Sequence, residues 1–301
     1  MQSLFAKPNM VAGLQPGLAT ANALSVRALS ASDEAEVWDF LSARPIHTVF
    51  MKGFIKQNGL VSDFNRGKFY GCRDMEGRLL GVALLGHITL IETRIDAALR
   101  AFANYARGGP SIYMILGEQE KVECFWDSYS AGAVEPRQQR RELLFVQEYP
   151  PPIFEPLPEL RVATPDDLRI LLPIYGQMHS QESGVNPLEV DPQGFSERWL
   201  RRIEQKQAWV WIKGEKLIFN ADIMCDTPDC TYLEGIYVAP NMRGKGYGLR
   251  CMSHLSHMLL ARARSLCLLC DDQNSAATNF FQKAGYDTAG YYKTIFLSWK
   301  S

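Results

Sequence analysis

The feature that most constrains the fold is residues 233–264, where a short apolar stretch, a glycine-rich segment and an amphipathic stretch follow one another. Residues 233–238 are apolar and rich in β-branched and aromatic side chains, and Pro240 follows, which predicts a strand that ends in a turn. Apolar residues then recur at three- and four-residue steps, which predicts a helix with one face on a sheet. These residues are Leu249, Met252, Leu255, Met258 and Leu259.

The segment between the predicted strand and helix has the composition of an anion-binding turn. It consists of Arg243, Gly244, Lys245, Gly246, Tyr247 and Gly248. Glycines let backbone N–H groups turn towards a pyrophosphate, the helix N-terminus adds its positive dipole end, and Arg243 and Lys245 add charge. The pattern is neither the dinucleotide fingerprint nor the P-loop. It predicts a phosphate-binding corner, against the alternative of an ordinary glycine hinge.

Two motifs resemble those of the GNAT superfamily of N-acetyltransferases. Arg243, Gly246 and Gly248 match its acyl-CoA signature of Arg or Gln, two residues, Gly, one residue, then Gly or Ala. Residues 274–286 match the family's segment N-x-x-A-x-x, two aromatics, three residues, Gly and an aromatic. The resemblance implies an α/β (α+β mixed sheet) fold, mostly antiparallel and flanked by helices, and acetyl-CoA as co-substrate.

Length and charge limit the classes of partner. A chain of 301 residues exceeds the usual size of one core, which predicts two domains. Lys and Arg number 32 against 33 Asp and Glu, without long blocks of one sign, so we expect no nucleic-acid partner. No apolar run approaches the roughly 20 residues that cross a bilayer, so we expect a soluble protein without a membrane partner. Seven cysteines without a secretory signal favour reduced thiols in the cytoplasm.

A proline-rich segment marks the predicted domain boundary. Residues 149–158 contain five prolines, which favour an extended connection. We therefore predict a leader at 1–20, an N-terminal domain at 21–149, a linker at 150–158 and a C-terminal domain at 159–301. Both predicted domains run strand, helices, hairpin, then strand into helix, which is a weak internal repeat.

The two predicted domains differ at the anion-binding turn. After the predicted strand 112–116, residues 117–120 read Gly-Glu-Gln-Glu, where the second half has Arg243 and three glycines. Two acids would repel a pyrophosphate, so we expect only the C-terminal domain to bind CoA. The whole chain resembles a bacterial GNAT subgroup with a degenerate GNAT-like N-terminal domain, and residues 178–184 and 186–187 resemble it as well.

Acetyl transfer to an amine needs a base, because a lysine-like amine has a pKa of about 10.4. Glu234 is the candidate: it lies on the predicted strand, and alternation places Glu234, Ile236 and Val238 on one face. The resemblance implies that this face meets the acceptor. The alternative is a solvated or salt-bridged strand residue.

The resemblance also implies how the acyl-CoA is held. Backbone N–H groups at Ile236, Tyr237 and Val238 would bind the thioester carbonyl and the pantetheine arm, and Asn274 would hold the arm. Phe281 lies where the family often has a tyrosine that protonates the leaving thiolate. The thiolate would therefore leave unaided, or Tyr286, Tyr237 or water would replace that tyrosine. Alternatively, Phe280 and Phe281 face the core.

Three further pairs of residues have a spacing that could suit ligand binding. His179 and Glu182 are three apart on a predicted helix and are candidates to recognise the amine, or a polar stripe beside solvent. His254 and His257 fit a helix surface better than a metal site. Cys267 and Cys270 fall in a predicted strand, where residues three apart face opposite ways, so we expect no metal.

The sequence therefore predicts a tandem GNAT-like N-acetyltransferase that acts on a primary amine of a small molecule or a protein. The N-terminal domain would shape the acceptor site. A mycothiol-synthase-like enzyme acting on a sugar-linked cysteinyl amine is an alternative, and a non-catalytic acyl-CoA-binding regulatory module is another. Acceptor identity, acyl length and oligomeric state stay open.

Overall fold

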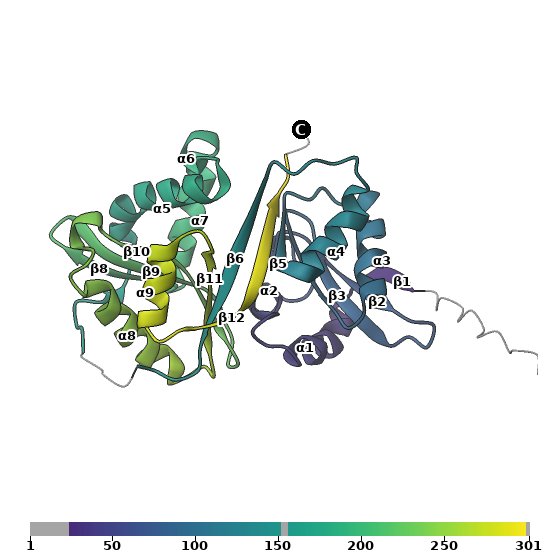
Figure 1. The fold of residues 1–301 in the computed structure, drawn as a ribbon, viewed down its shortest axis with the longest axis horizontal. Coiled ribbons are helices and arrows are strands. Elements are labelled where there is room, and N and C mark those ends of the chain that lie inside the picture. Colours follow the sequence, from purple (N-terminus) through teal and green to yellow (C-terminus); the bar gives the residue numbers. More distant parts are fainter. Residues whose placement is uncertain (1–23, 152–155, 299–301) are drawn as a thin grey trace, which may run out of the picture.

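The computed structural model describes residues 24–151 and 156–298, so the predicted leader and the middle of the predicted linker lie outside the described residues. The described strands form one 12-stranded mixed sheet in the order β1-β2-β3-β4-β5-β12-β6-β11-β10-β9-β8-β7. Helices flank the sheet in two lobes (Figure 1). The predicted α/β class is confirmed.

The two halves of the chain contain their strands and main helices in the same order, apart from the short elements η2, α6 and η4. The first half has β1 (Ser25–Ala28), η1 (Ala31–Asp33), α1 (Glu34–Ser42), α2 (Val49–Asn58), η2 (Asp63–Asn65), β2 (Lys68–Arg73), β3 (Leu79–Leu85), β4 (Ile88–Thr93), α3 (Asp96–Arg107), β5 (Met114–Glu118), α4 (Gln119–Ser130) and β6 (Gln138–Gln147). The second half has β7 (Arg161–Val162), η3 (Pro165–Asp167), α5 (Leu168–Ser183), α6 (Pro187–Val190), α7 (Pro192–Glu204), β8 (Ala208–Lys213), β9 (Lys216–Asp226), β10 (Thr231–Val238), η4 (Pro240–Met242), α8 (Tyr247–Leu260), β11 (Leu266–Asp271), α9 (Ser275–Lys283) and β12 (Asp287–Phe296).

The repeat extends to individual side chains at the start of each half. Arg27 pairs with Asp33 at 2.6 Å, and Arg161 pairs with Asp167 at 2.7 Å, six residues apart in both cases. Each aspartate also belongs to a capping box that begins the first helical segment of its half. The repetition suggested by element order is therefore present in the local hydrogen bonding.

The sequence-based comparison of residues 117–120 with the glycine-rich corner was wrong, because β4 was not predicted. β4 pairs in parallel with β5, just as β10 pairs in parallel with β11. The counterpart of the glycine-rich corner is therefore the turn at residues 94–96, between β4 and α3, and not residues 117–120. That turn reads Arg-Ile-Asp and contains no glycine.

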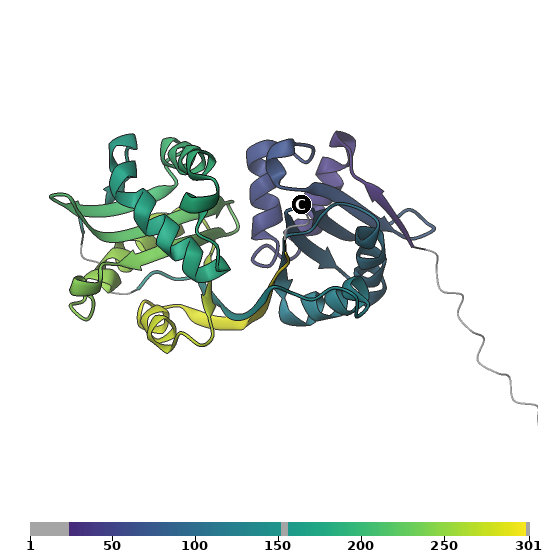
Figure 2. The ribbon, with the colours of Figure 1, turned by 90° about the horizontal axis from the view of Figure 1, so that it is seen from above.

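The halves exchange their last strands. β6 follows α4 as β12 follows α9, yet β12 pairs with β5 of the first half and β6 pairs with β11 of the second half. The two strands also pair with each other in antiparallel fashion and stand between the lobes (Figures 1 and 2). Each half of the sheet is therefore completed by the other half of the chain, and the domain boundary at the proline-rich segment stays a prediction.

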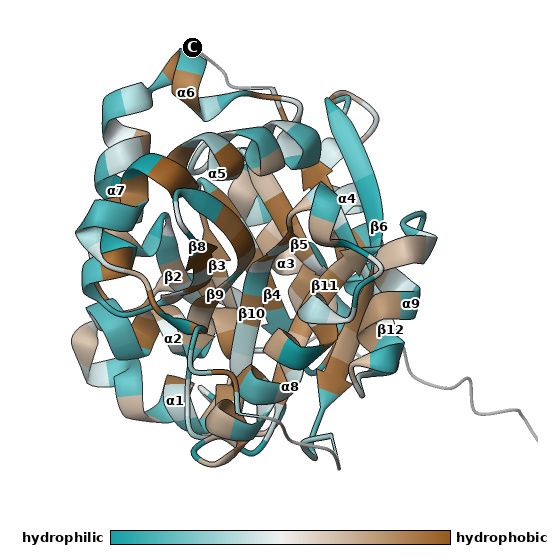
Figure 3. Cartoon of the chain, turned by 90° about the vertical axis from the view of Figure 1, so that its left-hand side faces the viewer, coloured by the Kyte–Doolittle hydropathy of each residue, from teal (hydrophilic) through white to brown (hydrophobic). Residues whose placement is uncertain are grey.

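Helices cover both faces of each half of the sheet. One core cluster of the first half contains apolar residues of α1 and α2, and another contains those of α3 and α4. In the second half, α5 and α7 cover one face, and α8 and α9 cover the other. Figure 3 shows apolar strands of this half behind the more polar outer surfaces of the helices.

Helix α2 joins the two lobes, because it packs against β9 and β10 of the second half. Phe50 lies 4.3 Å from the Tyr232 ring, and a Cβ at Gly53 would approach the Cys225 sulfur to 2.5 Å. Lys52 is fully buried and donates to Asp229 at 2.6 Å. An element of the first half therefore covers part of the sheet that carries Glu234.

Candidate active site

The predicted strand, turn and helix are present, and two glycines in the turn have conformations that other residues rarely adopt. Gly244 and Gly246 have φ values of +72° and +81°, and no atom lies within 4 Å of a Cβ built on either one. Among the described residues, no side chain caps the N-terminus of α8, whose first N–H groups lack intrahelical acceptors. The corner therefore leaves room for an anion, and its predicted role in binding phosphate stays a prediction.

The third glycine of the signature has a different role. A Cβ at Gly248 would come within 2.9 Å of both Phe280 and Val238, so its absence lets α8 pack closely. Arg243 donates through Nε to the Val238 carbonyl at 3.0 Å, which fixes the turn to the end of β10. Lys245 is exposed and remains able to contact a ligand.

The prediction that Glu234, Ile236 and Val238 share one face was wrong. Gly235 has a φ of +62°, and the pairing of β10 with β9 shifts register between Glu234 and Tyr237. This bulge changes the alternation of side chains. Ile236 and Val238 pack with the α8 side of the core, whereas Glu234 contacts α7 and Tyr237 packs with the α5 and α7 cluster.

The side of β10 next to β11 is largely unpaired. The parallel ladder contains only Thr231 with Leu266 and Tyr232 with Cys267, after which the two strands diverge. In the described chain no other strand pairs with the rest of β10 on that side. Asn274 is the N-cap residue of α9, and its side-chain oxygen accepts a hydrogen bond from the Ala277 amide. The unpaired edge of β10 and the N-terminus of α9 therefore both lie where β10 and β11 diverge.

Phe281 lies in the core. Its side chain is 6% exposed, and its ring centroid lies 5.6 Å from that of Phe145 and 5.3 Å from that of Phe280. Tyr286 is 1% exposed and lies beside the same cluster. The structure therefore supports the packing interpretation of Phe281 and places the Tyr286 hydroxyl away from solvent.

Among the described residues Glu234 has one ion-pair partner, which sequence reasoning missed. Arg202 of α7 donates to its carboxylate at 2.6 Å, and the two side chains are 23% and 33% exposed. The Arg202 guanidinium also lies 4.7 Å from the centre of the Trp199 ring. Both contacts restrict the orientation of Arg202, so it holds the Glu234 carboxylate in place while part of that carboxylate stays accessible.

A buried polar cluster beneath the bulge was also missed. The Tyr175 hydroxyl donates to Asp222 Oδ1 at 2.7 Å, and the Asn220 amide donates to Asp222 Oδ2 at 2.9 Å and to the Gly235 carbonyl at 2.8 Å. A Cβ at Gly235 would approach Asp222 to 2.1 Å. The cluster therefore fixes the bulge that directs Glu234. Two polar residues two positions apart in an apolar strand were its sequence signal.

Asp222 should make stability depend on pH. Burial raises its pKa from 3.8 to about 7, although hydrogen bonds from Tyr175 and Asn220 act in the opposite direction. Between about pH 4 and 7 the folded state binds the extra proton, so the free energy of unfolding should fall as pH rises, by up to about 1.4 kcal/mol per pH unit. Asp222→Asn should remove this slope in denaturant titrations across that range. Parallel pH profiles for the two proteins would contradict the assignment.

The predicted acceptor residues lie on α5, towards Glu234. His179 is exposed and its Nδ1 lies 3.1 Å from the Ser183 hydroxyl. Glu182 is accessible, yet desolvation by the surrounding protein raises its pKa to about 7, and the charge of Glu234 adds to this shift. The structure therefore brings Glu182 and Glu234 to the same side of the sheet.

The remaining predicted non-ligands have structural contacts. His254 Nδ1 accepts from the Leu157 amide at 3.1 Å, and His257 Nε2 lies 2.8 Å from the Pro151 carbonyl oxygen. Cys267 and Cys270 belong to different core clusters, which confirms their opposite orientation. Within residues 24–151 and 156–298, no three His, Cys, Asp or Glu side chains are grouped as metal ligands. Every described helix is too short or too polar to span a bilayer.

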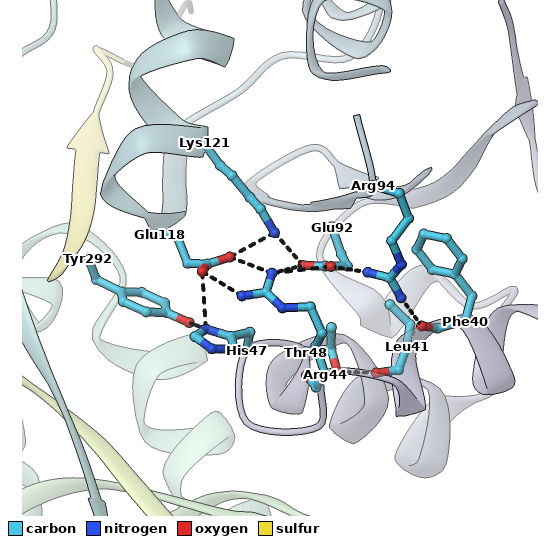
Figure 4. Close-up of polar contacts among 10 residues, drawn as sticks. All are labelled: Phe40, Leu41, Arg44, His47, Thr48, Glu92, Arg94, Glu118, Lys121 and Tyr292. Carbon is cyan, nitrogen blue, oxygen red and sulfur yellow. Dashed lines mark hydrogen bonds and ion pairs between the residues drawn. The ribbon is translucent and has the colours of Figure 1, made fainter. Parts of the chain in front are cut away.

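The corresponding region of the first half is closed by ion pairs (Figure 4). β4 and β5 also diverge after two residue pairs, but Arg44 contacts Glu92 at 3.1 Å and Glu118 at 2.6 Å, one carboxylate from each strand. Lys121 contacts the same two carboxylates at 2.8 and 2.7 Å. Burial opposes ionisation of Glu118, but hydrogen bonds from Arg44 and Lys121 lower its pKa to about 2. The diverging strands are therefore tied by charge.

Comparisons with known proteins agree with this geometry. The model of the Acetyltransferase (GNAT) family matches residues 179–286, which include the corner and Glu234. A GNAT-family acetyltransferase from Colwellia psychrerythraea is similar in structure, with a TM-score of 0.56 and 12% identity over 91% of this chain and 100% of the other. A GCN5-related N-acetyltransferase from Sphaerobacter thermophilus gives 0.56 and 12% over 90% and 94%.

A tandem protein is also similar. The tandem GNAT protein from the clavulanic acid biosynthesis pathway has a TM-score of 0.53 and 11% identity, over 93% of this chain and 100% of that one. At these identities the solved structures establish the fold alone. Among curated proteins, no sequence matches the chain.

Proposed function

We propose that this chain, whose residues 179–286 match the model of the Acetyltransferase (GNAT) family, transfers an acetyl group from acetyl-CoA to a primary amine. The observation that carries the proposal is the open, left-handed glycine corner at the start of α8, beside the diverging strands β10 and β11. An anion site and a free strand edge are what a phosphorylated, amide-containing co-substrate requires.

The residues of the corner fit the co-substrate. N–H groups around Gly244 and Gly246 and the first turn of α8 would hold the pyrophosphate, with Lys245 adding charge. The free edge of β10, near Ile236 and Val238, would hydrogen-bond the pantetheine arm and the carbonyl oxygen. Bound acetyl-CoA would supply the thioester that the amine attacks.

Glu234 would act as the base, either directly or through water. It is partly exposed on the α7 side of the sheet, and Arg202 fixes its orientation. Phe281 cannot protonate a thiolate, and Tyr286 is buried, so Tyr237 or water would supply that proton. Since a thiolate is a weak base compared with an amine, this step needs little assistance.

The first half would contribute to the acceptor site. Helix α2 lies against β9 and β10, with Phe50 on Tyr232, two residues before Glu234. The ion pairs of Arg44 and Lys121 tie the strands of the first half at the position equivalent to the free edge of β10. We therefore propose one CoA site per chain.

A cytoplasmic location fits the seven cysteines, all of which are unpaired.

Calorimetry with acetyl-CoA and CoA, followed by thiol-release assays on a panel of amines, tests the function. One acetyl-CoA site per chain and turnover on amines are expected. Binding without turnover on any amine would favour an acyl-CoA-binding regulatory module, and turnover restricted to cysteinyl amines would favour a mycothiol-synthase-like enzyme. Absence of binding would contradict the proposal.

A further inference from the structure

We propose that the acceptor amine carries a carboxylate or phosphate, which binds a basic surface beside Glu234 to which both halves of the chain contribute. This inference rests on the proposed function and narrows its substrate class. We call this surface the basic rim and define it by five residues. They are Arg66, His87, His179, Arg198 and Arg202.

The first-half side of the rim is a connected set of contacts. The Arg66 carbonyl, at the end of η2, accepts from the Ile88 amide at 3.2 Å, which places Arg66 beside His87. The His87 ring stacks on Tyr113 with centroids 4.8 Å apart. Arg137 donates to the Tyr113 hydroxyl at 3.3 Å, so the set extends to the start of β6.

The second-half side continues from there. Arg137 also donates to the Ser183 carbonyl at 2.6 Å, and the Ser183 hydroxyl lies 3.1 Å from His179. The His179 ring meets the Phe195 ring edge-on at 6.1 Å, and the Arg198 guanidinium lies 6.0 Å from the same ring. Arg202 follows one helical turn later. These contacts place His179, Arg198 and Arg202 along one side of α5 and α7.

Two contacts bring the end of α2 and the following η2 opposite the C-terminal part of α7 and so close the rim. The Arg201 guanidinium lies 5.6 Å from the Phe64 ring, and Gln57 donates to Gln205 at 2.8 Å. Phe64 precedes Arg66 by two residues. The positive charges of Arg198 and Arg202 also act on the Arg66 guanidinium, which places it near the stretch of α7 that carries them.

The charges of the rim are only partly compensated within the protein. Arg202 pairs with Glu234, and Arg198 pairs with Asp191 at 3.0 Å. The Arg66 guanidinium has no ion pair or hydrogen bond within the described residues, and desolvation together with Arg202 and Arg198 lowers its pKa to about 10. Burial and the positive charges of Arg66 and Arg198 lower the pKa of His87 to about 4, and burial also lowers the pKa of His179, so the charge of the rim at neutral pH comes from its arginines. The charge of Glu234 acts on Arg66 in the opposite direction, but Glu234 is already paired with Arg202, so Arg66 has no counter-ion of its own among the described residues.

The arrangement and the charges of these residues predict an acceptor with one positive and one negative end. A guanidinium binds carboxylates and phosphates through two parallel hydrogen bonds, so Arg66 suits an anionic group. Glu234 and Glu182 lie together on the sheet side and suit an ammonium group before its deprotonation. An amine without an anionic group would leave Arg66 unpaired.

Paired acceptors test this assignment. Glycine is compared with glycinamide and O-phosphoethanolamine with ethanolamine, so that the two pairs distinguish a carboxylate from a phosphate. Wild type should prefer the anionic member of at least one pair. Arg66→Ala should raise the KM for that acceptor about 10- to 100-fold, with an intermediate effect for Arg66→Lys and unchanged KM for acetyl-CoA. Arg169→Ala is the matched control, because Arg169 is exposed and pairs with Glu215.

The outcomes separate this inference from the proposed function. Equal use of anionic and neutral amines by wild type, or an unchanged preference in Arg66→Ala, overturns the inference while acetyl transfer stands. If no amine is acetylated, the proposed function fails. Calorimetry of the same amines with the CoA-bound protein then decides the inference: a preference for anionic amines that Arg66→Ala abolishes supports it, and equal or absent binding overturns it.

Discussion

Replacing Glu234 with glutamine is expected to lower kcat for acetyl transfer by about 10² to 10⁴-fold, the usual contribution of a general base. Glutamine keeps the size of the side chain and an oxygen that accepts from Arg202, but it cannot take a proton from the ammonium group. Steady-state kinetics at saturating amine, with acetyl-CoA affinity from calorimetry, measure the effect. The affinity should stay within about twofold of wild type, because the corner lies on the other side of the bulge.

The choice of acceptor amine provides the control for this prediction. An amine that is less basic needs less help to lose its proton and should reduce the loss in Glu234→Gln, whereas a residue that only positions Arg202 would lower the rate to the same extent for all amines. In Glu234→Gln, Arg202 is only 23% exposed and loses its charged partner, so the variant could also be less stable. Thermal unfolding of Glu234→Gln and of Arg202→Met would show how much of the loss of kcat comes from lower stability. An unchanged kcat would reduce Glu234 to a salt-bridged strand residue.

Replacing Gly246 with valine is expected to weaken acetyl-CoA binding by about 100-fold. A β-branched residue at a φ of +81° costs about 1–2 kcal/mol, so the free variant should relax from this conformation and binding must restore it at that cost. The side chain would also shield N–H groups whose bonds to a charged phosphate contribute a similar amount. Together these terms amount to about 3 kcal/mol, or roughly two orders of magnitude in Kd. Calorimetric titration with acetyl-CoA measures the change.

Two other glycines serve as controls. Gly214 has a φ of +61° with no atom within 4 Å of its Cβ position, so Gly214→Val imposes similar strain away from the corner. Its acetyl-CoA affinity should equal that of wild type. Gly248→Val should instead lower the free energy of unfolding by about 1–3 kcal/mol, because its side chain would overlap Phe280 and Val238. Equal losses of affinity at Gly214 and Gly246 would exclude a specific anion site.

Local patterns predicted the local structure well. The corner at residues 233–264 combines a short apolar strand, turn residues and a helical period, and each of these signals lies within a few residues. The same reasoning failed at Gly235, because alternation assumes an unbroken ladder and one left-handed glycine changes the phase. It also missed β4, a strand separated from β3 by only two residues, and with it the true counterpart of the corner.

The surroundings of Glu234 were less accessible to sequence reasoning. Arg202 is 32 residues away and Arg66 lies in the other half of the chain, so no local period connects them to the base. Asp222 and Asn220 interrupt an apolar strand, which indicates a special position but not the bulge that they support. Such contacts depend on the packing of helices on the sheet, and propensities do not determine it.

The exchange of β6 and β12 should delay folding of the first half during synthesis on the ribosome. N-terminal domains generally fold first, as units, while the remainder of the chain is still being made. Here the strand beside β5 is β12, which follows the whole second half in the sequence, so the first half cannot complete its sheet until β12 has been synthesised. Until then β5 presents an unpaired edge, the kind of surface that recruits other strands. The two lobes therefore reach their native state together, as a single cooperative event once β12 has been made.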